Sequence, residues 1–157
     1  TVFGVIYVPA QRLLYVGDVA SKKTYKVEVP SKNFTVEGLL NDAELLKPSQ
    51  NSNPIRVVGS RSHMNQDTLD YIEDLKTKYN KPVDIVSKGS SLKFCLVAEG
   101  NADVYPRYAP TMEWDTAAGQ AICKAVGLEV TSLDTSEEML YNRANLLNGY
   151  FHVKTEL

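Results

Sequence analysis

Cysteine, net charge and long apolar stretches are all scarce in this sequence of 157 residues. Its two cysteines, Cys95 and Cys123, are too few for a disulfide framework and lack the spacing of a metal site, so we expect two small buried hydrophobic side chains in a reducing compartment. The 17 Lys and Arg residues against 19 Asp and Glu residues leave a net charge of −2, which argues against a partner that is polymeric nucleic acid. No apolar run approaches the roughly 18 residues of a spanning helix, which argues against an integral membrane segment.

The rest of the composition is that of a globular chain. Hydrophobic residues make up 43% and charged residues 23%, which excludes a wholly disordered or collagen-like chain. A chain of this length buries about 70% of its extended surface on folding, enough for a real core. Residues 1–8 already have the pattern of a strand, without an initial Met or the charges of a signal peptide, so we expect the chain to belong to a longer protein.

The first part of the chain predicts three β-strands, at residues 3–8, 13–17 and 25–29. Short connections and many β-branched or aromatic residues favour an antiparallel meander. Three strands alone leave an open edge and an uncovered face, so the sheet needs a partner. The polar segment 47–54, which contains two prolines, is predicted to be a connector.

The second part alternates strands with helices. Helices are predicted at 65–79, 90–99 and 115–126, and strands at 55–59, 83–86, 102–105, 128–133 and 150–153. Asn65 is expected to cap the first of these helices, and Gly100 and Gly127 to end the other two. The alternation indicates an α/β fold with a mixed sheet flanked by helices, which the preceding strands extend to an α+β sandwich.

A polar tetrapeptide, Ser60-Arg61-Ser62-His63, directly follows the predicted strand at 55–59. Serine and histidine can donate hydrogen bonds to phosphate or ribose oxygens, and arginine adds a bidentate fork. Ligands of open α/β sheets gather at the carboxyl ends of the strands. The tetrapeptide is therefore a candidate anion site, and a plain polar turn is the alternative.

A second candidate turn follows the predicted strand at 83–86, with the sequence Lys88-Gly89-Ser90-Ser91-Leu92-Lys93. Gly89 permits close approach of the backbone to a ligand, and Ser90 or Ser91 can cap the helix. Lys93 would supply a point charge for a phosphate. The turn lacks the spacing of a Walker loop, and a simple capped helix is the alternative.

The third candidate is Asp115, in the segment Glu113-Trp114-Asp115-Thr116-Ala117-Ala118-Gly119. An aspartate at the start of a helix commonly caps it. Its carboxylate could instead be a ligand of Mg²⁺, which takes one or two carboxylates together with water and substrate phosphate. One carboxylate does not complete a metal site, so further ligands would have to come from elsewhere.

Taken together and in order, four motifs carry a family resemblance. They are Ser60-Arg61-Ser62-His63, Gly89-Ser90-Ser91-Leu92-Lys93-Phe94-Cys95-Leu96-Val97-Ala98-Glu99-Gly100, Tyr105-Pro106-Arg107 and Trp114-Asp115-Thr116-Ala117-Ala118-Gly119-Gln120-Ala121. The chain resembles, over essentially its whole length, the bacterial 3′(2′),5′-bisphosphate nucleotidases of the inositol monophosphatase superfamily. The Trp-Asp-x-x-Ala-Gly element is typical of the superfamily, and the first two motifs narrow the likeness to the nucleotidases.

The resemblance implies a role for each matching position. Asp115 resembles the catalytic, metal-binding aspartate of the C-terminal motif, which also faces the substrate. The positions that resemble nucleotide-contacting residues are Ser60 and His63, and those that resemble the surround of the nucleoside monophosphate are Gly89, Ser90, Lys93 and Arg107.

The chain departs from the family in one respect. The family's Glu-Glu pair and its Asp-Pro-(Ile/Leu)-Asp-Gly-Thr motif, which supply most metal ligands and help to activate the attacking water, are both missing from their expected place. The chain therefore resembles the C-terminal portion of such an enzyme. Residues 1–46 would be the last strands of the antiparallel domain with a connector, and residues 47–157 the C-terminal α/β domain. We expect it to need its missing N-terminal half and to be inactive alone.

The activity that the resemblance implies is magnesium-dependent hydrolysis of adenosine 3′,5′-bisphosphate, and of the related 3′-phosphoadenylyl sulfate, in sulfate assimilation. The first reaction yields AMP and phosphate. The expected location is the cytoplasm, with peripheral association with the inner membrane as an open alternative. The alternative functions are an inositol or fructose phosphate phosphatase, a noncatalytic nucleotide-binding module, and a fragment that completes a partner's fold.

Overall fold

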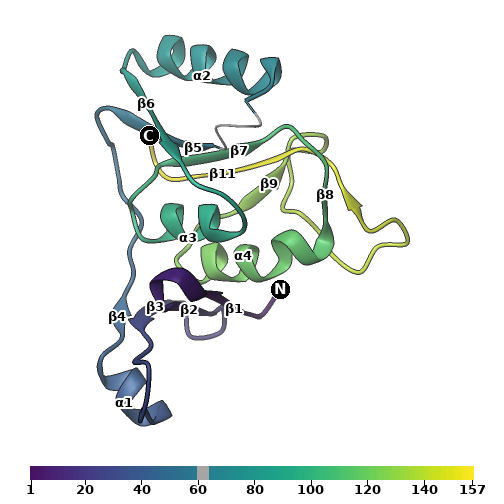
Figure 1. Ribbon diagram of the computed structural model, residues 1–157. Helices are drawn as coiled ribbons and strands as arrows, with labels where there is room; N and C mark the ends of the chain where they lie inside the picture. The colour runs from purple at the N-terminus through teal and green to yellow at the C-terminus, as the bar shows by residue number, and fades with distance from the viewer. Residues whose placement is uncertain (60–63) are drawn as a thin grey trace.

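The computed structural model of the protein describes residues 1–59 and 64–157 and arranges them in layers (Figure 1). The strands are β1 (Phe3–Val8), β2 (Leu13–Asp18), β3 (Lys23–Glu28), β4 (Glu44–Leu45), β5 (Ile55–Gly59), β6 (Val83–Ser87), β7 (Val104–Arg107), β8 (Thr111–Met112), β9 (Val130–Ser132), β10 (Leu147–Asn148) and β11 (Phe151–Lys154). The helices are α1 (Val36–Asn41), α2 (Gln66–Tyr79), α3 (Leu92–Ala98) and α4 (Glu113–Ala125), with a 3-10 turn at Pro9–Gln11. Helices α3 and α4 lie between two β-sheets, and α2 covers the far side of the larger sheet.

The first sheet is antiparallel, in the order β1-β2-β3-β4, which confirms the predicted meander. Gly4 and Gly17 face each other across β1 and β2. A Cβ at either position would collide with the backbone of α4, at 2.7 Å from the Cα of Ile122 in the case of Gly17. The two glycines therefore let α4 pack directly on the sheet. On the other face of β1, the side chains of Phe3, Val5 and Tyr7 are about half exposed.

The second sheet is mixed, as predicted, in the order β6-β5-β7-β11-β9. Strands β6, β5 and β7 run parallel, and β11 is antiparallel to both of its neighbours. The carboxyl ends of β5, β6 and β7 thus meet at one edge, beyond Gly59, Ser87 and Arg107. This is the edge at which open α/β sheets bind their ligands.

Several predicted boundaries are wrong by two residues. Helix α3 begins at Leu92, because Ser90 before it adopts the left-handed conformation, with φ of 56°. Strand β7 begins at Val104, because the amide of Ala102 still donates to Leu96 O at the end of α3. Helix α4 begins at Glu113, whose amide is held by Leu146 O. The helix ends at Gly100 and Gly127 are confirmed, with φ of 76° and 84°, and so is the Asn65 cap, which accepts from Thr68 N.

The core between the sheets is built on an aromatic cluster of Phe94, Tyr105 and Phe151. Their ring centroids lie between 5.1 and 5.8 Å apart. Cys95 and Cys123 are buried and free in α3 and α4, and burial raises the pKa of both thiols, which confirms their expected role as core side chains. The same core cluster includes Tyr15 of the first sheet, so the two sheets share one core.

The connector 47–54 is fastened to the mixed sheet by Asp103. This carboxylate is fully buried and accepts five hydrogen bonds, from Ser49, Ser52 and three nitrogens of Arg56. Burial alone would raise the pKa of Asp103, but these donors outweigh it and hold the pKa below its ordinary value. The division into domains at residues 46 and 47 remains a prediction.

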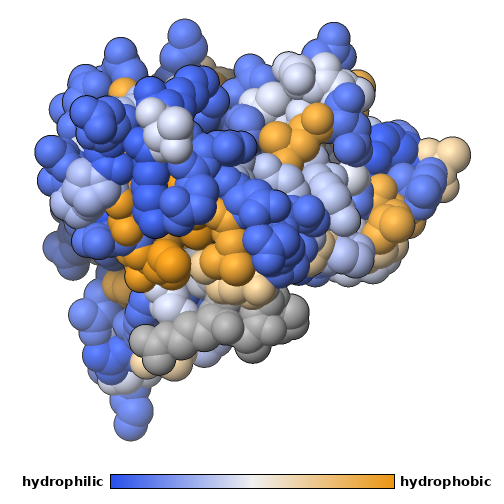
Figure 2. All heavy atoms as spheres, turned by 90° about the horizontal axis from the view of Figure 1, so that it is seen from above, coloured by the Kyte–Doolittle hydropathy of each residue, from blue (hydrophilic) through white to orange (hydrophobic). Residues whose placement is uncertain are grey.

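Seen from above, over α2, the surface is largely hydrophilic, with apolar side chains in small patches (Figure 2). None of the described helices is long and apolar enough to cross a membrane.

Candidate functional site

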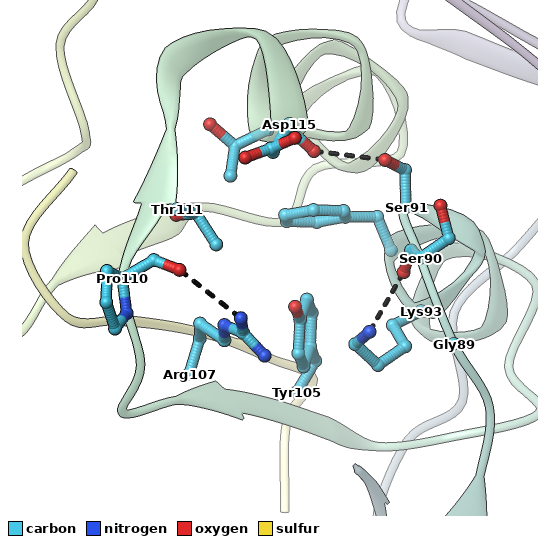
Figure 3. Close-up of a pocket in the computed structure, with 11 residues that line it drawn as sticks. Gly89, Ser90, Ser91, Lys93, Tyr105, Arg107, Pro110, Thr111 and Asp115 are labelled. Atoms are coloured by element: carbon cyan, nitrogen blue, oxygen red, sulfur yellow. Dashed lines mark hydrogen bonds between the residues drawn. The ribbon is translucent and has the colours of Figure 1, made fainter. Parts of the chain in front are cut away.

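A cavity of about 370 Å³ opens at the edge of the mixed sheet where the parallel strands end (Figure 3). It is enclosed by the turn before α3, the end of β7 and the first turn of α4. The lining residues are Gly89, Ser90, Ser91, Lys93, Phe94, Tyr105, Arg107, Pro110, Thr111, Asp115 and Thr116. The structure therefore brings five of the seven predicted site residues together, and their role in binding nucleotide remains a prediction. The other two, Ser60 and His63, lie outside the described residues.

Lys93 is a buried cation in the wall of this cavity. Its side chain lies on α3, and the residue is only 5% exposed. The ammonium donates to Ser90 O at 3.0 Å and lies 5.1 Å from the centroid of the Tyr105 ring. Burial, and to a lesser extent the charge of Arg107, lowers the pKa of Lys93 to about 8. An anion in the cavity would relieve this cost by neutralising the ammonium.

Arg107 stands opposite Lys93, at the end of β7 (Figure 3). One terminal nitrogen, Nη2, donates to Pro110 O at 3.3 Å. Its Nε is buried and has no hydrogen-bond partner within residues 1–59 and 64–157. A buried donor without a partner is costly, so a bound anion that accepted this hydrogen bond would be favoured.

Asp115 is the third residue of α4 rather than its N-cap. Its Oδ2 accepts from the amide of Met112, the N-cap residue, at 2.8 Å, so the side chain helps to satisfy the start of the helix. The residue is exposed at the cavity. Capping and ligand binding, which the sequence presents as alternatives, are therefore compatible at this position.

The turn before α3 differs from its prediction. Neither serine caps the helix through its side chain: Ser91 occupies the N-cap position without a capping hydrogen bond, and its hydroxyl donates to Asp115 O at 3.0 Å. This contact ties the turn to the first turn of α4. Gly89 has open space around its Cα, so the structure shows no packing reason for a glycine there.

A metal ion would find one carboxylate in this cavity. Asp115 is the only carboxylate among the lining residues, and the described parts of the chain contain no group of three or more His, Cys, Asp or Glu side chains suited to a metal. The adjacent acids Glu137 and Glu138 belong to a different cavity, where Glu138 pairs with Lys124. Asp115 fits a Mg²⁺ ion that takes one protein carboxylate here and its other ligands elsewhere.

Sequence reasoning missed several lining residues, of which Tyr105, Thr111 and Thr116 are polar. Tyr105 lies directly before Pro106 and Arg107, at the end of the strand predicted at 102–105. This position at a strand end could have indicated that Tyr105 lines the site. Burial raises the pKa of Tyr105 to about 12, which keeps its hydroxyl protonated at neutral pH. Thr111 belongs to a two-residue strand, which is too short to leave a pattern in the sequence.

The fold and this site define a class of protein: a layered α/β protein with a cavity at the ends of its parallel strands, lined by two cations and one carboxylate. The particular family follows from comparison with known proteins. The model of the inositol monophosphatase family matches residues 1–155, and the chain belongs to this family.

Among its relatives are two proteins called 3′(2′),5′-bisphosphate nucleotidase CysQ. The one from Salmonella typhimurium is 36% identical over 152 residues, which cover 97% of this chain and 54% of the relative. The one from Escherichia coli strain K12 is 34% identical over the same shares of the two chains. The chain thus spans about half of the length of these relatives.

Solved structures agree with this placement. The crystal structure of CysQ from Bacteroides thetaiotaomicron, described as a bacterial member of the inositol monophosphatase family, matches 99% of this chain and 58% of its own with a TM-score of 0.85 and 42% identity. An inositol monophosphatase from Zymomonas mobilis matches 99% of this chain with a TM-score of 0.67 at 13% identity, which supports the fold alone. The inositol monophosphatase-like fold predicted from the sequence is confirmed.

Proposed function

We propose that this chain is the substrate-binding part of a magnesium-dependent 3′(2′),5′-bisphosphate nucleotidase. Its substrates would be adenosine 3′,5′-bisphosphate, which yields AMP and phosphate, and the related 3′-phosphoadenylyl sulfate. The observation that carries the proposal is the convergence of Lys93, Arg107 and Asp115 on one cavity in a chain 36% identical to a CysQ nucleotidase. The proposal includes a cytoplasmic location, which cell fractionation tests.

The two cations would bind the phosphate of the nucleotide. Lys93 offers a point charge that its own burial leaves poorly solvated, and Arg107 offers the Nε donor described above. Because the two side chains come from α3 and β7, a phosphate between them would be held from two directions. Ser60 and His63 are proposed to contact the nucleoside, and Gly89 and Ser90 to border it.

Asp115 would hold one Mg²⁺ ion together with ligands from the remaining part of the protein. Such an ion polarises phosphoryl oxygens and lowers the pKa of bound water. The contribution of this chain is to place a carboxylate at the mouth of the cavity and to fix it through the Met112 amide.

Calorimetric titration with AMP tests the binding site directly. We expect the Arg107→Met variant to bind AMP roughly 10- to 150-fold more weakly than the parent, because a charge-assisted hydrogen bond contributes about 1.5 to 3 kcal/mol. Arg12→Met is the matched control, because Arg12 is an exposed partner of Glu28 at the far sheet. Equal affinities for the parent and the Arg107 variant would refute the assignment.

Phosphate release tests the reaction. With one carboxylate in the cavity, this chain alone is expected to hydrolyse adenosine 3′,5′-bisphosphate little or not at all, with or without Mg²⁺. Addition of the missing half should restore Mg²⁺-dependent release. Robust hydrolysis by the chain alone would contradict the expectation, and a preference of the complete protein for inositol phosphate would favour the alternative phosphatase.

A further inference from the structure

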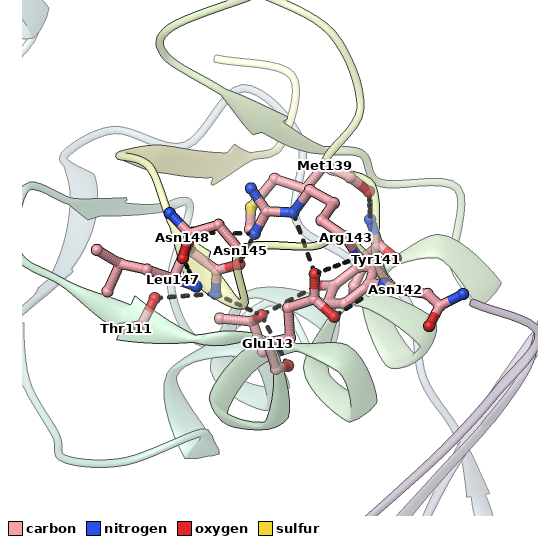
Figure 4. Close-up of polar contacts among 11 residues, drawn as sticks. Thr111, Glu113, Met139, Tyr141, Asn142, Arg143, Asn145, Leu147 and Asn148 are labelled. Carbon is pink, nitrogen blue, oxygen red and sulfur yellow. Dashed lines mark hydrogen bonds and ion pairs between the residues drawn. The ribbon is translucent and has the colours of Figure 1, made fainter.

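A chain of polar contacts supports the cavity wall from behind (Figure 4). We call it the Arg143 relay, and it consists of Glu113, Arg143, Asn148, Thr111 and Thr116. It joins the segment after β9 to the start of α4 across about 30 positions of sequence. Thr111 and Thr116 line the cavity, whereas Glu113, Arg143 and Asn148 do not.

The first link fixes the first residue of α4. The Glu113 carboxylate accepts from the amides of Asn142 and Arg143, at 2.8 and 3.2 Å, and from Arg143 Nε at 3.1 Å. The Glu113 side chain is 12% exposed and that of Arg143 is 39% exposed, so the ion pair lies at the surface, and the two backbone amides add charge-assisted hydrogen bonds to it. Glu113 lies two residues before Asp115 on the same helical turn, and its position therefore sets that of Asp115.

The second link runs through a buried amide. Arg143 Nη2 donates to Asn148 Oδ1 at 2.8 Å and to Leu147 O at 3.1 Å. Asn148 is 4% exposed, and its Nδ2 donates to the hydroxyls of Thr111 and Thr116, both at 3.1 Å. One amide thereby holds both threonines of the cavity wall.

The relay depends on the shape of the guanidinium. Arg143 uses Nε for Glu113 and Nη2 for Asn148, and the planar fork keeps these two partners at a fixed separation. A lysine ammonium would keep the charge but could not reproduce this fork. The contacts of Arg143 with Glu113 and Asn148 therefore require the guanidinium group and not only a positive charge.

We propose that Arg143 is a positioning residue of the cavity, which acts through Glu113 and Asn148 to hold Asp115, Thr111 and Thr116 in place. The proposal rests on the proposed function for its ligand, AMP, but the placement of the wall is a property of the chain itself. Within the described residues, the hydrogen bonds of the Arg143 side chain go to Glu113, Leu147 and Asn148, none of which lines the cavity, so Arg143 need not touch the nucleotide.

Substitution Arg143→Lys tests the proposal, with Arg12→Lys as the matched control on an ion pair of the far sheet. We expect AMP affinity to fall about fivefold or more in the Arg143 variant and to stay within about twofold of the parent in the control. Amide hydrogen exchange in residues 112–116 should accelerate about tenfold, while the amides of β5 and β11 keep their protection.

Asn148→Asp provides a second variant of nearly the same size. It retains the acceptor for Arg143 but lacks the amide donor for Thr111 and Thr116. If the two residues act through one relay, the double variant should lose less affinity than the sum of the two single losses.

Each contrary outcome is distinct. Parent-like affinity and parent-like exchange in residues 112–116 would overturn the proposal. Uniform loss of protection throughout the chain would show a general structural role and would also overturn it. If the parent does not bind AMP, the proposed function fails, and hydrogen exchange in residues 112–116 alone decides the role of Arg143.

Discussion

Replacement of Lys93 by methionine should weaken nucleotide binding and at the same time stabilise the chain. Methionine has a similar length and no charge, so it fills the space of the lysine stem between Ser90 and Tyr105. The affinity for AMP should fall by roughly 10- to 150-fold, because the variant lacks a charge-assisted hydrogen bond to phosphate.

The gain in stability follows from the burial of the ammonium. A pKa lowered from 10.5 to about 8 means that the folded chain holds this proton with a penalty of about 3 kcal/mol at pH 7. The variant loses the hydrogen bond to Ser90 O and the contact with the Tyr105 ring, which offset part of the gain. We expect a net increase of about 1 to 3 kcal/mol in the free energy of unfolding at pH 7.

The sign of the pH dependence is fixed by the direction of the shift. Because the folded pKa of Lys93 is depressed, the unfolded chain binds more protons between pH 8 and 10.5, and the stability of the parent rises with pH across that window. The difference in unfolding free energy between the methionine variant and the parent should therefore be largest below pH 8 and shrink toward pH 10.5. AMP binding near pH 8.5 should also take up a proton, because an anion raises the pKa of the ammonium.

Urea unfolding at pH 7 and pH 9.5, and calorimetry of AMP binding in two buffers of different ionisation enthalpy, measure these effects. A methionine variant that is less stable than the parent at pH 7 would show that the ammonium is adequately solvated or paired. An AMP affinity within twofold of the parent's would remove Lys93 from the site. Lys76→Met is the control, because Lys76 is a surface partner of Glu73 on α2.

Three further predictions concern other parts of the chain. In the complete protein, Asp115→Asn should abolish Mg²⁺-dependent phosphate release with little change in melting temperature, because an amide oxygen can still accept from the backbone at the helix start; residual specific activity in an unstable variant would favour a purely structural role. Asp103→Asn should destabilise the chain by about 3 kcal/mol at pH 7, because it leaves Arg56 without its anion. Because the pKa of Asp103 in the folded chain is depressed, the difference in unfolding free energy between parent and variant should be complete above about pH 4. It should disappear as the pH falls through the pKa of the folded chain. Urea unfolding at a series of acidic pH values measures this difference. Strand β1 pairs on one side only within the described residues and exposes Val5 at 48%, so this chain alone should self-associate, and Val5→Lys should reduce that association in sedimentation velocity; a monomeric parent would contradict this.

The sequence predicted the elements with strong periodicity and missed those without it. Helix α2 was predicted to within a residue because its apolar positions and its Asn65 cap are local signals. Helix α1, with no buried residue, and the two-residue strands β8 and β10 leave no such signal. Boundaries shifted where tertiary contacts decide them, as at Glu113, whose amide is held by Leu146 O.

The candidate site shows the same division. The sequence presents Lys93 and Asp115 as candidates because each lies in a polar segment near the start of a predicted helix, and Arg107 because its motif resembles the nucleotidases. Their convergence on one cavity depends on the parallel pairing of β5 with β6 and β7, which no local pattern reports. The relay through Arg143 and Asn148 was not predictable, because its partners lie about 30 residues apart and only the fold brings them together.

Helix α4 connects the cavity to the first sheet, two parts of the protein that could otherwise vary independently. It carries Asp115 in its first turn, and further along its backbone lies directly against Gly4 and Gly17 of the first sheet, at Ala118 and at Ile122. A methyl group added at either glycine would displace the helix axis and, with it, the carboxylate. The cavity therefore limits which substitutions β1 and β2 tolerate, although neither strand contributes a lining residue. A design that transfers this cavity to another scaffold would have to transfer the two glycines as well.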